Sequence, residues 1–167
     1  MGGLGAVPET HRGGDIMALY SSSGGSDGER AVDSLRLTDS EWLAYVAELD
    51  RESARHIDAS TERRHERVAY RNVVHLLATL HNQDGRTQKF MVRTHDLSES
   101  GMGFLHGSFI YPQSRIQLVL HHRMHGQSYH DGIVRRCEHF KRHIHRIGVE
   151  FDKPITLEDY LLAAKTG

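Results

Sequence analysis

The spacing of hydrophobic and polar positions changes along this 167-residue chain. Residues 1–34 show no period and are rich in Gly and Ser, as in SSSGGSDGER, which predicts a disordered N-terminal tail. In residues 35–60 apolar positions recur at helical spacing, and Trp42, Val46 and Leu49 form one stripe. This pattern predicts an amphipathic helix followed by a linker.

The start of this helix is marked by two signals in the sequence. Thr38 and Glu41 stand three residues apart and form a capping box. Leu37 and Trp42 are spaced for a hydrophobic staple across the first turn. The apolar stripe needs a surface to cover it, and we expect that surface to be the following domain rather than a second chain.

From Val68 onwards apolar and polar residues roughly alternate, with a period of two residues, which is typical of β-strands. VAYRNVVHLLATL predicts a first strand, and Asp84-Gly85 predicts a hairpin turn before QKFMVRT. After the loop HDLSESG, four more strands are predicted: MGFLH, RIQLVLH, SYHDGIVRRCEHF and HIHRIGVEF. Six strands with short turns and no helix between them predict a mainly β fold, a closed antiparallel barrel over residues 61–153.

The end of the chain returns to a helical pattern. TLEDYLLAA follows Pro154, and Thr156 is placed as an N-cap, so we expect a short C-terminal helix within residues 154–167.

The net charge of −1 conceals an uneven distribution of charge. Residues 61–151 contain 14 Lys and Arg against 8 Asp and Glu, a balance of +6, and the rest contains 7 against 14, a balance of −7. A basic centre suggests an anionic partner. The alternative is that the acidic flanks only neutralise the domain and keep it soluble.

Composition also favours a cytoplasmic protein. No apolar run reaches the length of a membrane span, and the N-terminus lacks the pattern of a secretory signal. The one cysteine, Cys137, excludes an internal disulfide and fits a reducing compartment.

Two short motifs stand out because of their residue types and order. Arg63 and Arg67 are four residues apart, with Arg64 beside the first, just ahead of the first predicted strand. Farther along, Asp96, Ser98 and Gly101 follow the spacing D-x-S-x-x-G in the predicted loop. Each motif has a plain structural interpretation: the arginines form a solvated collar or ion pairs with neighbouring glutamates, and Asp and Ser serve the turn.

Taken together with the strand pattern and the closing HRIGVEF, these motifs resemble the PilZ domain. The resemblance covers about residues 62–153, and it implies a bacterial protein with a PilZ-type barrel that binds cyclic di-GMP through the two motifs. It then assigns the ligand site to Arg63, Arg64, Arg67, Asp96, Ser98 and Gly101. An alternative register pairs Arg67 with Arg71; we prefer Arg63 and Arg67, because the family's second arginine leads directly into the strand.

The residue types suit this ligand on chemical grounds. Arginine hydrogen-bonds phosphate oxygens and guanine O6 and N7, and its planar face stacks on bases. Asp96 would accept hydrogen bonds from guanine N1–H and N2–H. Ser98 offers a hydroxyl to the ligand or the loop, and Gly101 permits a tight turn or a close approach of the backbone.

Other chemistry is less well supported by the sequence. Two groups of histidines could be considered as metal ligands: His121, His122 and His125, and His143 with His145. Neither group has a cysteine or an acidic residue at the spacing of a metal site, so we expect surface histidines and no metal site. No nucleophile–base pair or phosphate-binding glycine loop indicates an enzyme. The strands show no row of exposed aromatic residues, which makes a nucleic-acid-binding barrel unlikely on this pattern.

The expected function is therefore that of a receptor without a cofactor, whose ligand is cyclic di-GMP. Binding would order the arginine-rich segment and pass the signal to a downstream protein partner. Glu62 stands directly before the first motif arginine. Family members that bind a stacked pair of cyclic di-GMP molecules carry an arginine at this position, so we expect one cyclic di-GMP per chain. The alternative is a PilZ-fold interaction module that binds no nucleotide.

Overall fold

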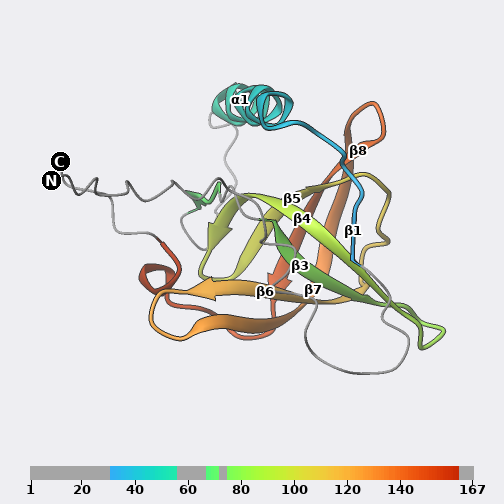
Figure 1. Ribbon diagram of the computed structural model, residues 1–167, viewed down its shortest axis with the longest axis vertical. Coiled ribbons are helices and arrows are strands. Elements are labelled where there is room, and N and C mark those ends of the chain that lie inside the picture. Colours follow the sequence, from blue (N-terminus) through green and yellow to red (C-terminus); the bar gives the residue numbers. More distant parts are fainter. Residues whose placement is uncertain (1–30, 56–66, 72–74, 162–167) are drawn as a thin grey trace, which may run out of the picture.

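A computed structural model describes residues 31–55, 67–71 and 75–161 of the chain. Its centre is a closed barrel in which every strand pairs with two neighbours (Figure 1). The order around the barrel is β4-β3-β6-β7-β8-β5, and β5 pairs with β4 to close it, all antiparallel. The strands are β3 (Leu76–His81), β4 (Thr87–Ser98), β5 (Gly101–His106), β6 (Arg115–His122), β7 (Gly126–Lys141) and β8 (Ile144–Phe151). The predicted six-stranded barrel is confirmed.

The predicted hairpin turn joins β3 to β4. Gly85 has φ +81°, a left-handed conformation that glycine adopts without strain. Asn82 N–H donates to the Arg86 carbonyl at 2.8 Å, and Arg86 N–H donates to Asp84 Oδ1 at 3.0 Å. The Asp84-Gly85 signal therefore identified the turn correctly.

The first predicted strand is divided in the structure, which corrects the expectation of one continuous strand. β2 (Val68–Ala69) and β3 both pair with β4, but eight positions separate Val68 from Leu76, whereas their partners Leu97 and Val92 are only five apart. Of the described residues between these two strands, Tyr70, Arg71 and His75 lie in neither, so the predicted strand is not continuous. Arg71 consequently lies after β2 and not inside a strand.

Two other boundaries differ from the sequence pattern. β4 continues through Ser98, so Asp96 and Ser98 lie in a strand and not in the expected loop. β1 (Val32–Asp33), at the end of the segment expected to be a disordered tail, pairs in parallel with Phe90 and Met91 of β4. Residues 1–30 of that expected tail lie outside the described residues.

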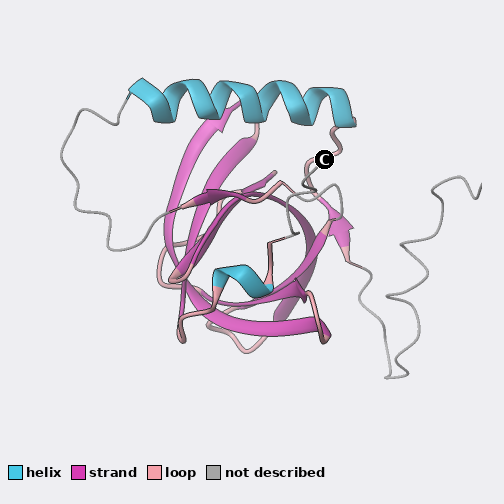
Figure 2. Cartoon of the chain, turned by 90° about the vertical axis from the view of Figure 1, so that its left-hand side faces the viewer, coloured by secondary structure: helices cyan, strands magenta, loops and turns pink. Residues whose placement is uncertain are grey.

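The N-terminal helix forms as predicted. α1 (Asp39–Arg55) starts with the capping box: Thr38 N–H donates to Glu41 Oε2 at 2.9 Å, and Glu41 N–H donates to Thr38 Oγ1 at 3.3 Å. The stripe of Trp42, Val46 and Leu49 is buried, together with Leu35 and with Leu105 and Ile144 of the barrel. Figure 2 shows α1 lying across the outside of the barrel. The helix stripe therefore packs on the domain of its own chain.

Arg93 of β4 attaches the start of this helix to the barrel. Its side chain is almost fully buried and donates to the Leu37 carbonyl at 3.2 Å and to Asp39 Oδ1 at 3.0 Å. Its guanidinium also lies 5.8 Å from the centre of the Trp42 ring. A buried arginine with several partners fixes the helix in one position on the barrel.

The C-terminal helix is shorter than predicted in the residues that the structure describes. Leu157–Asp159 form a single 3-10 turn, and residues 162–167 lie outside the described part. Thr156 stands at the N-cap, but its side chain makes no capping hydrogen bond. Tyr160 and Ile155 nevertheless pack into the main barrel core, so this turn closes one part of the domain.

Helix packing can be tested with two leucines of α1. Leu49 is fully buried, whereas Leu43 is 63% exposed. Leu49→Ala should lower the free energy of unfolding by about 2–5 kcal/mol, because it removes packed methyl groups and leaves a cavity. Leu43→Ala, the same change on the same helix, should alter it by no more than about 0.5 kcal/mol. Denaturant unfolding measures both, and equal effects would contradict docking of the helix on the barrel.

Candidate functional site

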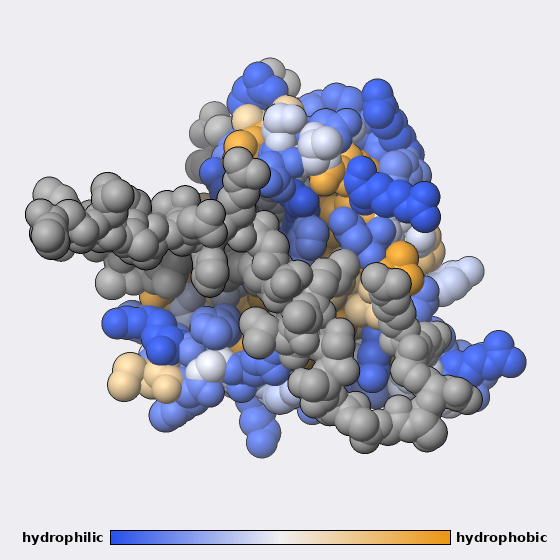
Figure 3. Space-filling view, in the orientation of Figure 1, coloured by the Kyte–Doolittle hydropathy of each residue, from blue (hydrophilic) through white to orange (hydrophobic). Residues whose placement is uncertain are grey.

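A pocket of about 490 Å³ lies on the outer surface of the barrel, beside the C-terminal half of α1. Its walls come from α1, from the segment around β2, and from β4, β5, β7 and β8. Hydrophilic residues dominate the visible, described surface in Figure 3, with hydrophobic residues in small patches. The charged and titratable residues of the pocket are Arg67, Arg71, Arg135, Arg136, Arg146, Asp50, Asp96, Glu150 and His95. The pocket is therefore rich in arginine.

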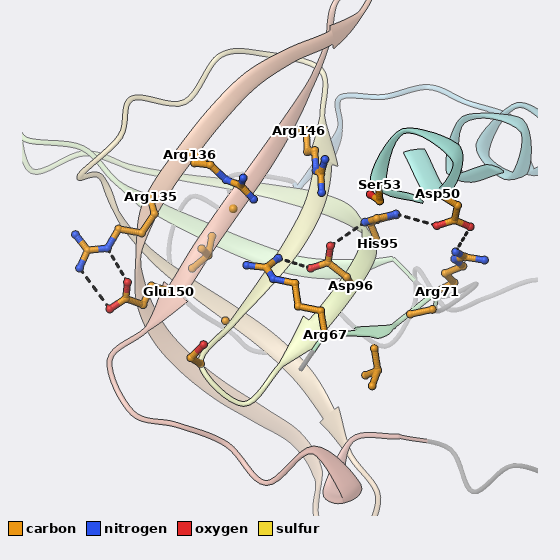
Figure 4. Close-up of a pocket in the computed structure, with 16 residues that line it drawn as sticks. Asp50, Ser53, Arg67, Arg71, His95, Asp96, Arg135, Arg136, Arg146 and Glu150 are labelled. Atoms are coloured by element: carbon orange, nitrogen blue, oxygen red, sulfur yellow. Dashed lines mark hydrogen bonds and ion pairs between the residues drawn. The ribbon is translucent and has the colours of Figure 1, made fainter. Parts of the chain in front are cut away.

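Asp96 and Arg67 form the central ion pair of this pocket (Figure 4). Arg67 Nη1 donates to Asp96 Oδ1 at 2.7 Å, although the two residues are 29 positions apart. β2 makes this contact possible because Ala69 pairs directly with Asp96 on β4. The motif arginine and the motif aspartate of the sequence thus meet in one place.

The position of Asp96 depends on an irregularity in β4. The pairing with β5 shifts between Thr94 and Asp96, so one extra residue enters β4 at His95. Thr94 is opposite Phe104 of the core, and Leu97 returns to the core, which leaves both His95 and Asp96 on the outer surface. The bulge therefore presents two adjacent polar side chains to the pocket.

Asp96 is buried and ionised. Burial by itself would raise the pKa of this carboxyl, but the hydrogen bond from His95 and the charge of Arg67 lower it to about 2. His95 Nδ1 lies 2.9 Å from Asp96 Oδ2, so each carboxylate oxygen has one partner. Asp96 is consequently a fixed negative charge at every physiological pH.

A second set of polar contacts links this pair to the helix. His95 Nε2 lies 3.5 Å from Asp50 Oδ1 on α1, and Arg71 forms an ion pair with the other oxygen, Asp50 Oδ2. Figure 4 shows the resulting row from Asp96 through His95 and Asp50 to Arg71. The end of the helix therefore shares a polar network with the centre of the pocket.

The residues singled out from the sequence are only partly brought together. Arg67, Asp96 and Gly101 line the pocket, and Arg63 and Arg64 lie outside the described residues. Ser98 is buried beside the pocket, and its hydroxyl donates to the Gly101 carbonyl at 3.2 Å, which is a structural contact.

Gly101 is required by the fold itself. A Cβ at this position would lie 2.1 Å from the Val149 carbonyl oxygen of β8. Its lack of a side chain therefore permits a close approach of two strands, in addition to any role towards a ligand.

Several pocket residues were missed by sequence reasoning. His95 directly precedes the D-x-S-x-x-G motif, and Arg146 lies in the HRIGVEF segment, but neither belongs to a recognisable binding spacing. Arg135 and Arg136 come from β7, and Arg135 forms an ion pair with Glu150 at 3.0 Å. The signal available in the sequence was the alternation of Arg146, Gly148 and Glu150, which places these residues on one face of a strand.

The described residues give two further findings. They contain no group of three or more His, Cys, Asp or Glu side chains placed to hold a metal ion. None of their helices is both long and apolar enough to cross a membrane.

Several solved structures are similar to this chain, including the following three. The PilZ domain of YcgR from Escherichia coli, solved with c-di-GMP, has 19% identity and a TM-score of 0.44, over 55% of this chain and 79% of that one. The MrkH–c-di-GMP complex of K. pneumonia has 17% identity and a TM-score of 0.43, over 60% and 48%. The Bacillus subtilis inhibitor of motility (MotI/DgrA) has 11% identity and a TM-score of 0.41, over 60% and 47%. This chain therefore spans about half the length of the last two proteins.

Comparison with curated protein sequences gave no match. A family model, in contrast, matches residues 61–164, which is more than half of the chain and includes the whole barrel, and its description is PilZ domain. The match begins at the arginine-rich segment and includes both motifs that meet in the pocket. This chain belongs to the PilZ domain family.

Proposed function

We propose that this protein is a receptor for cyclic di-GMP and that the arginine-rich pocket is its binding site. The observation that carries the proposal is the ion pair between Arg67 and Asp96, which unites the two family motifs in one pocket on the barrel. In the PilZ family these motifs bind cyclic di-GMP together. The proposed ligand site comprises Arg63, Arg64, Arg67, Asp96, Ser98 and Gly101.

The chemistry of the pocket supports an anionic ligand with hydrogen-bond donors. Five arginines and three carboxylates line it, so positive charge is in excess, and guanidinium groups bind phosphate oxygens in a bidentate manner. Asp96 has two carboxylate oxygens with about four acceptor sites, of which Arg67 and His95 use two. Guanine N1–H and N2–H can therefore donate to Asp96 without displacing His95.

Ser98 has an indirect part in this proposal. Its hydroxyl holds the Gly101 carbonyl, and this bond shapes the turn between β4 and β5 beside the pocket. A receptor role fits these groups better than catalysis, because the sequence offers no nucleophile–base pair beside the arginines. We also retain the expectation of one ligand per chain and of action in the cytoplasm.

The relay of the signal is proposed to pass through the arginine-rich segment to helix α1 and from there to a partner protein. Arg67 and Arg71 lie on the same short segment, and Arg71 holds Asp50 of the helix. A phosphate bound by Arg67 would shift this segment, and the shift would draw Arg71 away from Asp50. Binding would then reorder the segment and release the last turns of the helix for a partner.

The alternative function is an interaction module with the PilZ fold that binds no nucleotide. The proposed function and this alternative are separated by titrating the full chain with cyclic di-GMP, with GTP and single-stranded DNA as controls. Saturable heat with cyclic di-GMP alone supports the receptor, and absence of any heat supports the interaction module.

Arg67→Ala should weaken cyclic di-GMP binding about 10- to 100-fold, because a charge-assisted contact contributes about 1.5–3 kcal/mol. Arg115→Ala is the matched control: Arg115 is also an exposed arginine in an ion pair, with Asp152, and it lies outside the pocket. Calorimetric titration and thermal melting of both variants decide the matter. Wild-type affinity in Arg67→Ala would refute the site.

Arg71→Ala distinguishes the two possible registers of the arginine motif. If Arg63 and Arg67 form the motif, this variant should bind cyclic di-GMP much more like the wild type than Arg67→Ala does. A loss as large as that of Arg67→Ala would assign the motif to Arg67 and Arg71 instead.

Asp96→Ala should bind cyclic di-GMP far more weakly than Asp96→Asn. The amide keeps one acceptor oxygen for guanine, whereas alanine keeps none, so we expect at least about a tenfold difference between the two variants. Both variants also lose the ionised partner of Arg67, so melting curves must show that each is folded at the titration temperature. Equal affinity of Asp96→Ala and the wild type would show that Asp96 serves only the fold.

Asp50→Ala should uncouple the helix from the ligand. In the wild type we expect cyclic di-GMP to speed amide hydrogen exchange in the last turns of α1, because Arg71 leaves Asp50. In Asp50→Ala the exchange should be fast already and change little on binding. Glu52→Ala, an exposed acidic residue on the same helix, should respond like the wild type. A full ligand response in Asp50→Ala would contradict this route.

A further inference from the structure

A row of outward-facing residues crosses four neighbouring strands at the level of Asp96. Asp96 of β4 pairs with Gly103 of β5, Gly103 pairs with Gly148 of β8, and Gly148 pairs with Arg136 of β7. Three strand spacings of about 4.8 Å place the two charged ends of this row about 14 Å apart at their Cα atoms. Two glycines therefore separate a carboxylate from a guanidinium.

The glycines give each charged side chain room to lie on the sheet. A Cβ on Gly103 would be 2.8 Å from Asp96 Oδ1, so the carboxylate lies over this residue. A Cβ on Gly148 would be 3.4 Å from Arg136 Nε and 3.6 Å from its Cβ, so the arginine side chain lies over Gly148. A methyl group at Gly103 would therefore push the carboxylate aside. A methyl group at Gly148 would only make ordinary contact with Arg136, so a larger side chain is needed there to displace the arginine.

Arg136 and Arg146 differ from the other pocket arginines in their partners. Arg67, Arg71 and Arg135 form ion pairs with Asp96, Asp50 and Glu150, respectively. Within the part of the chain that the structure describes, neither the Arg136 nor the Arg146 side chain forms a hydrogen bond or an ion pair, although both residues pair in the β7–β8 ladder. Figure 4 shows their guanidinium groups and that of Arg67 pointing towards the same part of the pocket.

The electrostatic surroundings of Arg146 agree with an unmatched charge. Burial lowers the pKa of Arg146, and the nearby charges of Arg136 and Arg67 lower it further, whereas Asp96 and Glu138 raise it. Glu138 is opposite Arg146 on β7 but is exposed and makes no ion pair with it. A half-buried cation without a partner is costly unless an anion is bound beside it.

We propose that Arg136 and Arg146 form a phosphate-binding pair on the β7–β8 side of the pocket, and that Gly148 provides the space in which Arg136 lies. The inference rests on the proposed function, since the phosphate is a phosphodiester of cyclic di-GMP. The ligand then extends across β5 and β8, with a guanine at Asp96 and a phosphodiester at Arg136 and Arg146. Both arginines are binding residues that neither family motif contains.

Phosphate fits this pair better than a base does. Two guanidinium groups from adjacent strands present several donors and no acceptor. Asp96, which raises the pKa of Arg146, already has Arg67 and His95 as partners. A phosphodiester supplies two charged oxygens for such donors.

The first test uses inorganic pyrophosphate as the probe and does not depend on cyclic di-GMP. In the full chain, the arginine Nε–H signals of Arg136 and Arg146 should shift together as pyrophosphate is added, and that of Arg115 should not. A shift of all three, or of none, would overturn the phosphate pair. The pyrophosphate test gives a result even if the wild type binds no cyclic di-GMP. Failure to bind cyclic di-GMP would refute the proposed function but not the phosphate pair.

The second test is calorimetric titration of Arg136→Ala, Arg146→Ala and Arg115→Ala with cyclic di-GMP and with cyclic GMP-AMP, which keeps both phosphates but only one guanine. In Arg136→Ala and in Arg146→Ala, the affinities for both ligands should fall by the same factor, about tenfold or more. In Arg115→Ala neither affinity should change. A loss confined to cyclic di-GMP would mean that the arginines recognise guanine. Wild-type affinity in both variants, with binding intact in the wild type, would exclude them from the site.

A variant that keeps every charge isolates the role of Gly148. Gly148→Val should displace the Arg136 side chain from the sheet. The affinity for cyclic di-GMP should then fall towards that of Arg136→Ala. Melting curves show whether the variant is folded. A folded Gly148→Val with wild-type affinity would show that the position of Arg136 over Gly148 does not matter. Gly148→Ala is the matched control, because its methyl group would only make ordinary contact with Arg136, and it should keep wild-type affinity.

Discussion

The bulge in β4 is the constraint on which the rest of this structure depends. A regular strand would alternate through Val92 and Thr94 and turn Asp96 into the core, where an ionised carboxylate has no place. One extra residue resets the alternation, so that Leu97 returns to the core while His95 and Asp96 remain outside. The same strand pairs along its edges with β1, β2, β3 and β5. Barrel closure and site formation are therefore properties of one strand.

The electrostatic organisation of the pocket follows from this placement. Asp96 is buried deeply enough to need a cation, and Arg67 reaches it because β2 pairs with β4 immediately beside the bulge. His95 points the other way, towards Asp50, and so connects the barrel to a helix that Arg93 and the Trp42 stripe hold in place. The helix is thus attached by apolar packing at its start and by polar contacts near its end. Polar contacts exchange partners at lower cost than a packed core, so the C-terminal half is the part that a ligand can influence.

Sequence patterns predicted the fold and identified three residues that line the pocket, Arg67, Asp96 and Gly101, but not the rest of its lining. Alternation, the Asp84-Gly85 turn and the Thr38 capping box are local patterns, and the structure confirms each of them. A bulge is not local, because it depends on which residues of β5 pair with β4. No sequence pattern indicated that the predicted loop at Asp96 continues the strand. Likewise, Arg136 lines the pocket only because of the register between four strands. The interruption after β2 was missed because apolar residues continue through it.

The arrangement of partners around Asp96 would allow the proposed ligand to enter this pocket without disturbing the barrel. A buried carboxylate needs compensation in every state of the protein, and it has two independent sources. Arg67 comes from a separate segment, whereas His95 belongs to the same strand and moves with it. When phosphates attract Arg67, His95 still satisfies one carboxylate oxygen, and donors of a base can satisfy the other. The carboxylate is then never left without a partner, so binding can rearrange the arginines while the barrel beneath them stays closed.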